Sequence, residues 1–145
     1  MSGDDLSLEG FDFLYMPSRD VAKDLAFYRE TLGATVVFAI EAMGARVAEV
    51  DLGVGKPRLL LADHLEGEAP TLVHRVADLT RAIAELTRRG LAPEAEFGIP
   101  HGPCATFVSP GGQRLAIYEL TRPEADVRFA GRLDFSPDRA GSKGP

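Results

Sequence analysis

The stretch DVAKDLAFYRETLG, residues 20–33, decides the fold, because a later stretch repeats its plan. It opens with Asp20, a favoured residue at helix N-termini because its carboxylate accepts hydrogen bonds from the amides of the first turn. It closes with Gly33, which takes a positive φ without steric cost. Its apolar residues recur at helical spacing and form one stripe: Val21, Leu25, Tyr28 and Leu32. The sequence therefore predicts an amphipathic helix here.

The second stretch, DLTRAIAELTRRG, covers residues 78–90 and follows the same plan. Asp78 stands 58 positions after Asp20, and Gly90 ends the stretch as Gly33 ends the first. Its apolar stripe consists of Leu79, Ile83 and Leu86. The regular offset indicates an internal repeat of the whole unit around each helix.

Strand-like segments surround both predicted helices in the same order. Each helix follows one segment rich in apolar residues and precedes three more, bounded by Gly and Pro. The predicted strands are residues 11–16, 35–40, 46–52 and 58–62 in the first half, and 71–76, 94–97, 104–108 and 114–120 in the second. The predicted fold class is α+β, with two tandem βαβββ modules whose curved mixed sheets enclose one cleft.

The modules are expected at residues 9–64 and 70–122, together forming one domain over residues 9–122. The linker between them is polar and interrupted by Gly and Pro. Residues 123–145 form a C-terminal extension rich in Pro, Gly and charge, which is either loose or docked on the surface. Its apolar residues are available for packing: Val127, Phe129, Leu133 and Phe135.

The composition of the chain argues against two classes of partner, nucleic acids and membranes. A net charge of −6 and a pI near 5.0 argue against nucleic acid and anionic membranes. No run approaches the roughly 18 apolar residues of a membrane-spanning helix, and the acidic start, residues 1–5, is unlike a secretory signal. The single Cys104 excludes an internal disulfide and fits a reducing compartment. We expect a cytoplasmic protein that binds neither nucleic acid nor membrane.

Several short motifs together resemble the vicinal oxygen chelate superfamily, which includes glyoxalases, extradiol dioxygenases and bleomycin-resistance proteins. They are Asp20 with Phe27-Tyr28 and Leu32-Gly33, then Val76-Ala77-Asp78-Leu79, and the turn Ser109-Pro110-Gly111-Gly112-Gln113. The resemblance covers about residues 9–122. It implies the tandem module fold and a homodimer, but one fold hosts many chemistries.

The metal enzymes of that superfamily carry ligands at four equivalent points. The resemblance places them at Phe13, Leu60, Thr71 and Ala116. Three of these side chains have no donor atom and a neutral Thr hydroxyl is a weak one, so we expect no metal and no cofactor there. A relocated site would need several other side chains to converge, and the candidates are Asp63, His64, His74, His101 and Glu119.

Alternation along the strands predicts a largely apolar cleft lined by aromatic and basic residues. Phe11 is expected on the cleft face of the first strand, with Phe13 and Tyr15. The candidate ligand-binding residues are Phe13, Tyr15, Arg75, His101, Arg114 and Tyr118. Arginines in such a cleft could hold a carboxylate or a phosphate bidentately. The alternatives are ordinary: strand-end arginines are often simply solvated, and strand aromatics often fill the core.

Three functions stay open at this point. The first is metal-independent binding of a small aromatic molecule, with or without an anionic group, as in the bleomycin-resistance branch. The second is a glyoxalase- or dioxygenase-like enzyme, a lyase or oxidoreductase, with an atypical metal site. The third is a domain whose main contact is its own dimer partner. The sequence singles out no catalytic residue, and Cys104 fits a small buried hydrophobe better than a nucleophile.

Overall fold

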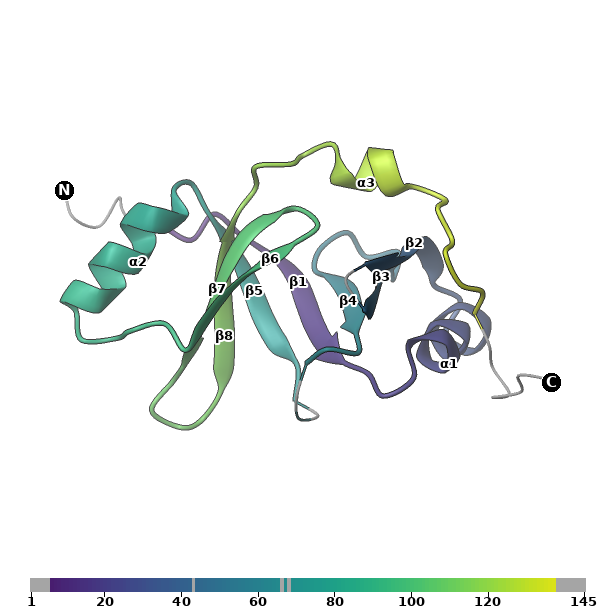
Figure 1. Ribbon diagram of the computed structural model, residues 1–145, viewed down its shortest axis with the longest axis horizontal. Helices are drawn as coiled ribbons and strands as arrows, with labels where there is room; N and C mark the ends of the chain where they lie inside the picture. Colours follow the sequence, from purple (N-terminus) through teal and green to yellow (C-terminus); the bar gives the residue numbers. More distant parts are fainter. Residues whose placement is uncertain (1–5, 43, 66, 68, 138–145) are drawn as a thin grey trace. The chain divides into compact units, whose positions relative to one another are not determined.

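The computed structural model describes residues 6–42, 44–65, 67 and 69–137, and the chain divides into two compact units (Figure 1). The α1 unit comprises residues 13–70 and 126–145, and the α2 unit comprises residues 1–12 and 71–125. Residues 1–5 and 138–145, and positions 66 and 68 of the predicted linker, lie outside the described residues. Strand β1 (Gly10–Pro17) begins in the α2 unit and ends in the α1 unit.

The α1 unit follows the predicted βαβββ order. After β1 come α1 (Val21–Ala26), the π-helix η2 (Phe27–Thr31), β2 (Thr35–Ala42), β3 (Ala45–Asp51) and β4 (Arg58–Ala62). The sheet order is β2-β3-β4-β1, with antiparallel β2/β3 and β3/β4 pairs. Strand β1 lies parallel to β4 and pairs Phe13 with Arg58. The sheet is therefore mixed.

The α2 unit repeats this arrangement with β5 (Thr71–Val76), α2 (Leu79–Arg88), β6 (Ala95–Ile99), β7 (Gly102–Val108) and β8 (Arg114–Glu119). The sheet order is β5-β8-β7-β6, and β5 lies parallel to β8 as β1 does to β4. Helix α3 (Ala125–Phe129) follows β8. The α+β class and the tandem βαβββ modules are confirmed. The single domain over residues 9–122 and the enclosed cleft stay predictions.

The repeat extends to the helix caps. The Asp20 carboxylate accepts from the Lys23 amide at 3.1 Å, and the Asp78 carboxylate accepts from the Arg81 amide at the same distance. Each carboxylate satisfies an amide that has no partner within its own helix. Both predicted N-caps are therefore confirmed.

The first helix differs from its prediction in its last turn. Residues Phe27–Thr31 form a π-helix, in which the Leu32 amide donates to the Phe27 carbonyl at 3.3 Å. A π-turn holds one more residue than an α-turn, so it rotates later side chains out of the α-helical stripe. Leu32 is 57% exposed, whereas Leu25 in the preceding turn is fully buried. The apolar stripe thus ends before Leu32.

Each helix covers one face of its own sheet. Helix α1 packs on β3 and β4, in a core that includes Leu25, Val50, Leu59 and Leu61. Helix α2 packs on β7 and β8, in a core that includes Ala82, Phe107 and Ile117. Because side chains alternate along a strand, neighbouring residues such as Glu49, Leu60 and Tyr118 point to the faces opposite the helices. Those faces carry the candidate site residues.

From residue 126 on, the described part of the C-terminal extension belongs to the α1 unit and runs along the edge of β2 (Figure 1, yellow). The Ala39 amide donates to the Arg132 carbonyl at 2.8 Å, and the Asp134 amide donates to the Ala39 carbonyl at 2.7 Å. Phe135 joins the core beneath α1 and is 8% exposed. Of the two alternatives for the extension, docking holds for these residues.

The buried stripe of the first helix gives a stability prediction. Leu25→Ala should lower the free energy of unfolding by roughly 2–5 kcal/mol, because it removes a fully buried aliphatic side chain and leaves a cavity. Leu32→Ala, on the same helix but exposed, should change it by less than about 0.5 kcal/mol. Urea denaturation of the two variants measures both values, and equal losses would contradict the assignment of the core.

Candidate functional site

The six candidate ligand-binding residues divide between the two units. Arg75, His101, Arg114 and Tyr118 lie in the α2 unit, whereas Phe13 and Tyr15 lie in the α1 unit. Each group is therefore built up within its own unit, starting from the strands that carry it.

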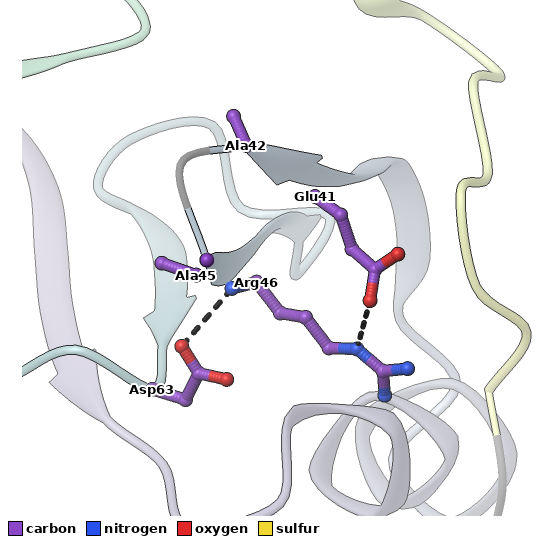
Figure 2. A pocket seen from close by; sticks show the side chains of 6 residues that line it. Glu41, Ala42, Ala45, Arg46 and Asp63 are labelled. Atoms are coloured by element: carbon purple, nitrogen blue, oxygen red, sulfur yellow. Dashed lines mark hydrogen bonds and ion pairs between the residues drawn. The ribbon is translucent and has the colours of Figure 1, made fainter.

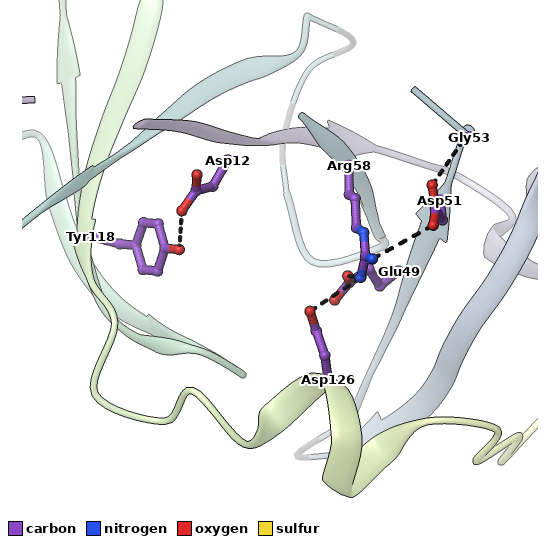
Figure 3. A network of polar contacts seen from close by, with 7 residues as sticks. All are labelled: Asp12, Glu49, Asp51, Gly53, Arg58, Tyr118 and Asp126. Carbon is purple, nitrogen blue, oxygen red and sulfur yellow. Dashed lines mark hydrogen bonds and ion pairs between the residues drawn. The ribbon is translucent and has the colours of Figure 1, made fainter. Parts of the chain in front are cut away.

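In the α2 unit, Arg75 and Tyr118 meet at a carboxylate that the sequence had not singled out. The parallel β5/β8 register pairs Arg75 with Tyr118 on the face opposite α2. The Tyr118 hydroxyl donates to Asp12 Oδ2 at 2.6 Å (Figure 3), and Arg75 Nη1 donates to the same oxygen at 2.7 Å. Asp12 is 1% exposed. We call these three residues the Asp12 cluster.

The electrostatics of the Asp12 cluster fix its hydrogen-bond directions. A buried carboxylate is costly unless it is paired, and here a guanidinium and a hydroxyl both satisfy it. Burial and the adjacent Asp12 carboxylate raise the pKa of the Tyr118 phenol. The phenol therefore keeps its proton at neutral pH and acts as the donor.

Sequence reasoning missed Asp12 because it placed Phe11 on the wrong face. Phe11 instead stacks on His74, with ring centroids 5.1 Å apart. His74 is the neighbour of Arg75 on β5, so it lies on the other face of that strand. This puts Phe11 on the α2 side and its neighbour Asp12 on the side of Arg75. A single acidic residue between aromatics on a strand was the available signal.

Arg114 is already engaged at the opposite end of β8 from Tyr118. Its Nε and Nη2 donate to the two carboxylate oxygens of Glu94 at 2.7 and 2.8 Å. The Thr106 hydroxyl also donates to Oε1 of Glu94, at 3.3 Å. Arg114 therefore presents a guanidinium whose carboxylate partner comes from the chain itself.

His101 sits in a loop that main-chain contacts hold firmly. The side chain is buried, and its carbonyl accepts from the amides of Thr121 and Arg122 at 3.1 and 2.9 Å. The Arg122 guanidinium donates to the carbonyls of Ile99 and Pro100. The loop is shorter than predicted, because residues 98–99 and 102–103 belong to β6 and β7.

The chain has no room for a side chain at Gly102, which follows His101 in this loop, and this can be tested. A Cβ there would lie 1.9 Å from the Glu119 carbonyl oxygen, which leaves no room for a side chain. Gly102→Ala should therefore lower the free energy of unfolding by more than about 2 kcal/mol. Gly98→Ala is the matched control, because a Cβ at Gly98 meets nothing within 4 Å. Thermal denaturation of both variants is the measurement, and equal stability would contradict the close approach.

In the α1 unit, Phe13 and Tyr15 are buried strand aromatics. Tyr15 is 1% exposed, and its hydroxyl lies 3.1 Å from Nε2 of His64 at the end of β4. The two rings meet edge to face, with centroids 5.8 Å apart. His64 thus serves as the polar partner of a buried tyrosine.

A second polar cluster in the α1 unit gathers three carboxylates around Arg58, at the start of β4 (Figure 3). Arg58 Nη1 donates to Glu49 at 2.8 Å and to Asp126 at 3.2 Å, and Nη2 lies 3.5 Å from Asp51. Glu49 is fully buried, and its hydrogen bond is the main reason that the pKa of Arg58 is raised. We call these residues the Arg58 cluster. The sequence had not singled out Glu49 or Asp126.

The four positions that the resemblance implies for metal ligands do not fit a divalent metal. Phe13, Leu60, Thr71 and Ala116 are all buried, and only the Thr hydroxyl offers a donor atom. Among the alternatives, Glu119 accepts from the Leu79 amide at 2.9 Å and so serves the N-terminus of α2.

Cys104 lies on β7, on the face opposite α2, and is 1% exposed. Burial raises the pKa of its thiol to about 12. Because the thiolate is the reactive form, Ellman's reagent at pH 8 should modify the native protein at least about 100-fold more slowly than the protein unfolded in guanidinium. Comparable rates would contradict a structural role for this cysteine.

An open pocket of about 390 Å³ lies at the end of the β2–β3 hairpin (Figure 2). Its lining residues are Glu41, Ala42, Gly44, Ala45, Arg46 and Asp63. Arg46 donates to Glu41 through Nε at 2.7 Å and lies over the Phe135 ring at 4.4 Å. None of the six candidate ligand-binding residues lines this pocket. The guanidinium that does line it, that of Arg46, is already paired with Glu41.

Among the described residues, no helix has the length and apolar character that crossing a membrane requires. No family model matches the chain, and no curated protein matches it at a significant level.

Solved structures nevertheless share its fold. Methylmalonyl-CoA epimerase from Mycobacterium tuberculosis superposes with a TM-score of 0.67 and 18% identity, over 83% of this chain and 93% of that chain. The Streptomyces coelicolor methylmalonyl-CoA epimerase in complex with 2-nitronate-propionyl-CoA gives a TM-score of 0.65 and 18% identity, over 80% and 97%. A hypothetical protein from Bacillus halodurans superposes with a TM-score of 0.65 and 15% identity, over 76% of this chain and 93% of that chain. At 15–18% identity these likenesses show a shared fold, which is the fold that the resemblance implied.

Proposed function

We propose that the chain binds a small aromatic molecule, with or without an anionic group, and that it does so without a metal ion. The observation that carries the proposal is the Asp12 cluster, a set of polar groups that hold one another in place on the face opposite α2. Val73, Ala116 and Cys104 lie on that same face and are buried. An apolar surface with a few oriented polar groups is the usual composition of a small-molecule site.

Within this proposal, Arg75 and Tyr118 are the polar contacts of the ligand. Asp12 accepts from Nη1 of the guanidinium, Nη2 donates to the Glu9 carbonyl at 3.4 Å, and Nε lies 3.7 Å from the Glu9 carboxylate. The Arg75 side chain is 27% exposed, so its outer edge can donate to a ligand carboxylate in place of Glu9. The Asp12 carboxylate partly compensates the charge of Arg75, so a neutral aromatic ligand is also compatible.

The shared fold supports a small organic ligand rather than a macromolecule. The Streptomyces epimerase holds a CoA derivative. The four positions that the resemblance implies for metal ligands offer a single donor atom, the Thr71 hydroxyl. This favours ligand binding without a metal over the glyoxalase- or dioxygenase-like alternative, which would need a metal held elsewhere. The proposed ligand-binding residues Phe13, Tyr15, His101 and Arg114 stay predictions.

A homodimer in the cytoplasm likewise stays a prediction. The resemblance implies it, and the apolar residues of the C-terminal extension offer additional surface for a partner. Phe135 instead packs in the core of its own unit, and Phe129 packs on Phe38 with ring centroids 5.6 Å apart. Val127 is 80% exposed and remains available.

A thermal-shift screen tests the proposed function, with benzoate, 1-naphthoate and a planar aromatic antibiotic as probes. A true ligand at a hundredfold excess over its dissociation constant should stabilise the native state by about 2.7 kcal/mol, in buffer containing EDTA. Arg75→Lys and Tyr118→Phe should each reduce this stabilisation, whereas Arg81→Ala on the exposed surface of α2 should leave it unchanged.

The same screen can overturn the proposal. Stabilisation that survives both Arg75→Lys and Tyr118→Phe would place the ligand elsewhere. Turnover of a catechol or a thiol adduct that appears only with added divalent metal would favour the enzyme alternative.

A further inference from the structure

We infer that residues 126–130, the α3 segment, occupy a second ligand site on the α1 unit, and that this site takes an aromatic carboxylate. The inference is independent of the proposed function, because it concerns the other unit and different residues. It rests on two contacts that the α3 segment makes with the sheet beneath it, one through Asp126 and one through Phe129.

The first observation is the contact between Asp126 and Arg58. Asp126 reaches from α3 to Nη1 of Arg58 at 3.2 Å, as Figure 3 shows. The two side chains are 37% and 28% exposed, so solvent reaches this ion pair. Glu49, in contrast, is fully buried and holds Arg58 in place from β3. The guanidinium is therefore fixed by one carboxylate and covered by another that water can reach.

The second observation is an aromatic contact beside it. The ring of Phe129 meets the ring of Phe38 edge to face, with centroids 5.6 Å apart and planes at 63°. Phe38 lies on the face of β2 opposite α1, because its neighbour Ala39 belongs to the core beneath α1. Phe38 is completely buried, so the α3 segment covers an aromatic surface on the same face as Arg58.

Together these two contacts present the features of one small molecule. Asp126 and Phe129 are three residues apart on a helix, so their side chains lie on the same side of it. A carboxylate binds a guanidinium while an aromatic ring a short distance away packs on an aromatic residue. An aromatic carboxylate carries the same two groups. Such a molecule could therefore replace both contacts at once, and it would leave the charge around Arg58 unchanged.

The chain on either side of Gly131 is held with unequal strength. Residues 131–135, which we call the anchor, make main-chain hydrogen bonds to both Val37 and Ala39. Asp134 also accepts from the Glu41 amide at 2.8 Å, and Phe135 is buried. The contacts of the α3 segment with the sheet include an ion pair that solvent reaches, between Asp126 and Arg58, and the ring contact of Phe129 with Phe38. Gly131 joins the two parts with a φ of +77°, a conformation that suits glycine. Displacement of the α3 segment would leave the hydrogen bonds between the anchor and β2 in place.

The test measures the dissociation constant of 1-naphthoate by calorimetry. Because the site is closed in most molecules, the apparent dissociation constant is the intrinsic value divided by the open fraction. The double variant Asp126→Ala/Phe129→Ala should therefore bind 1-naphthoate at least about fivefold more tightly than the natural chain. Val127→Ala is the matched control on the same short helix, and it should stay within about twofold because Val127 is 80% exposed.

A second variant removes the anion contact without leaving Glu49 unpaired. Arg58→Lys keeps the positive charge but loses the planar fork, so it should weaken binding about tenfold or more while the protein stays folded. Cyclohexanecarboxylate, which lacks the aromatic ring, should bind more weakly than 1-naphthoate. Hydrogen exchange in residues 127–130 should accelerate when 1-naphthoate binds the natural chain, whereas exchange of the Gly131 and Asp134 amides, which donate to β2, should not change.

Several results would overturn the inference. No tightening in the double variant, an unchanged constant in Arg58→Lys, or no binding by any variant would each do so. If Arg75→Lys abolishes binding and Arg58→Lys does not, the ligand belongs to the Asp12 cluster, and only the proposed function survives. If Arg58→Lys abolishes binding and Arg75→Lys does not, the inference holds and the proposed function fails for this probe.

Discussion

The parallel pairing of the first strand of each module with the last is the constraint on which the rest depends. A parallel pair needs a long connection, and each module fills it with one helix and two further strands. The helix covers one face of the sheet, so the other face of each sheet carries the groups available for function. The same pairing sets the partners: Phe13 beside Arg58 in one module, and Arg75 beside Tyr118 in the other.

Each of the two faces opposite the helices holds a buried carboxylate, Asp12 in the α2 unit and Glu49 in the α1 unit. Asp12 and Glu49 are almost completely excluded from solvent, and each is paired with an arginine on a strand of its own unit. Removing one partner of such a pair is expensive because the remaining charge stays buried. The clusters therefore fix where the arginines point. A conservative substitution such as Arg to Lys keeps the buried carboxylate paired with a positive charge, so it should perturb folding less than removal of the charge.

Local signals predicted most of the fold. The capping residues Asp20 and Asp78, the glycines that end each stretch and the period of the apolar residues each report on a few neighbouring positions. Those are the interactions that fix helix and strand boundaries. The π-turn after Ala26 was not predicted, because the apolar stripe through Leu32 fits an α-helix equally well by spacing alone. Its exposed position follows only from the hydrogen bond that Leu32 makes.

The candidate site was less accessible to sequence reasoning, because its polar partners come from distant segments. Alternation assigns a residue to one of two faces, but it does not say which face meets which neighbour. For this reason Phe11 was predicted on the face of β1 that Asp12 occupies. Asp126 meets Arg58 across 68 positions of chain, and no local pattern encodes such a contact. The arginines and Tyr118 were predicted by type and face, whereas the carboxylates that orient them were not.

The two modules also show where a repeated unit can diverge. Both last strands begin with an arginine, Arg58 in β4 and Arg114 in β8, and both arginines bind carboxylates. In the α2 unit the carboxylate is Glu94, just before β6, so it belongs to the repeated module itself. In the α1 unit one of the carboxylates, Asp126, comes from beyond both modules. The extension therefore supplies a polar contact that the repeat alone does not contain. Arg58 is thus held twice, by Glu49 and Asp51 of β3 within its own module and by Asp126 from a separate segment, so loss of the Asp126 contact would still leave this arginine oriented by the sheet.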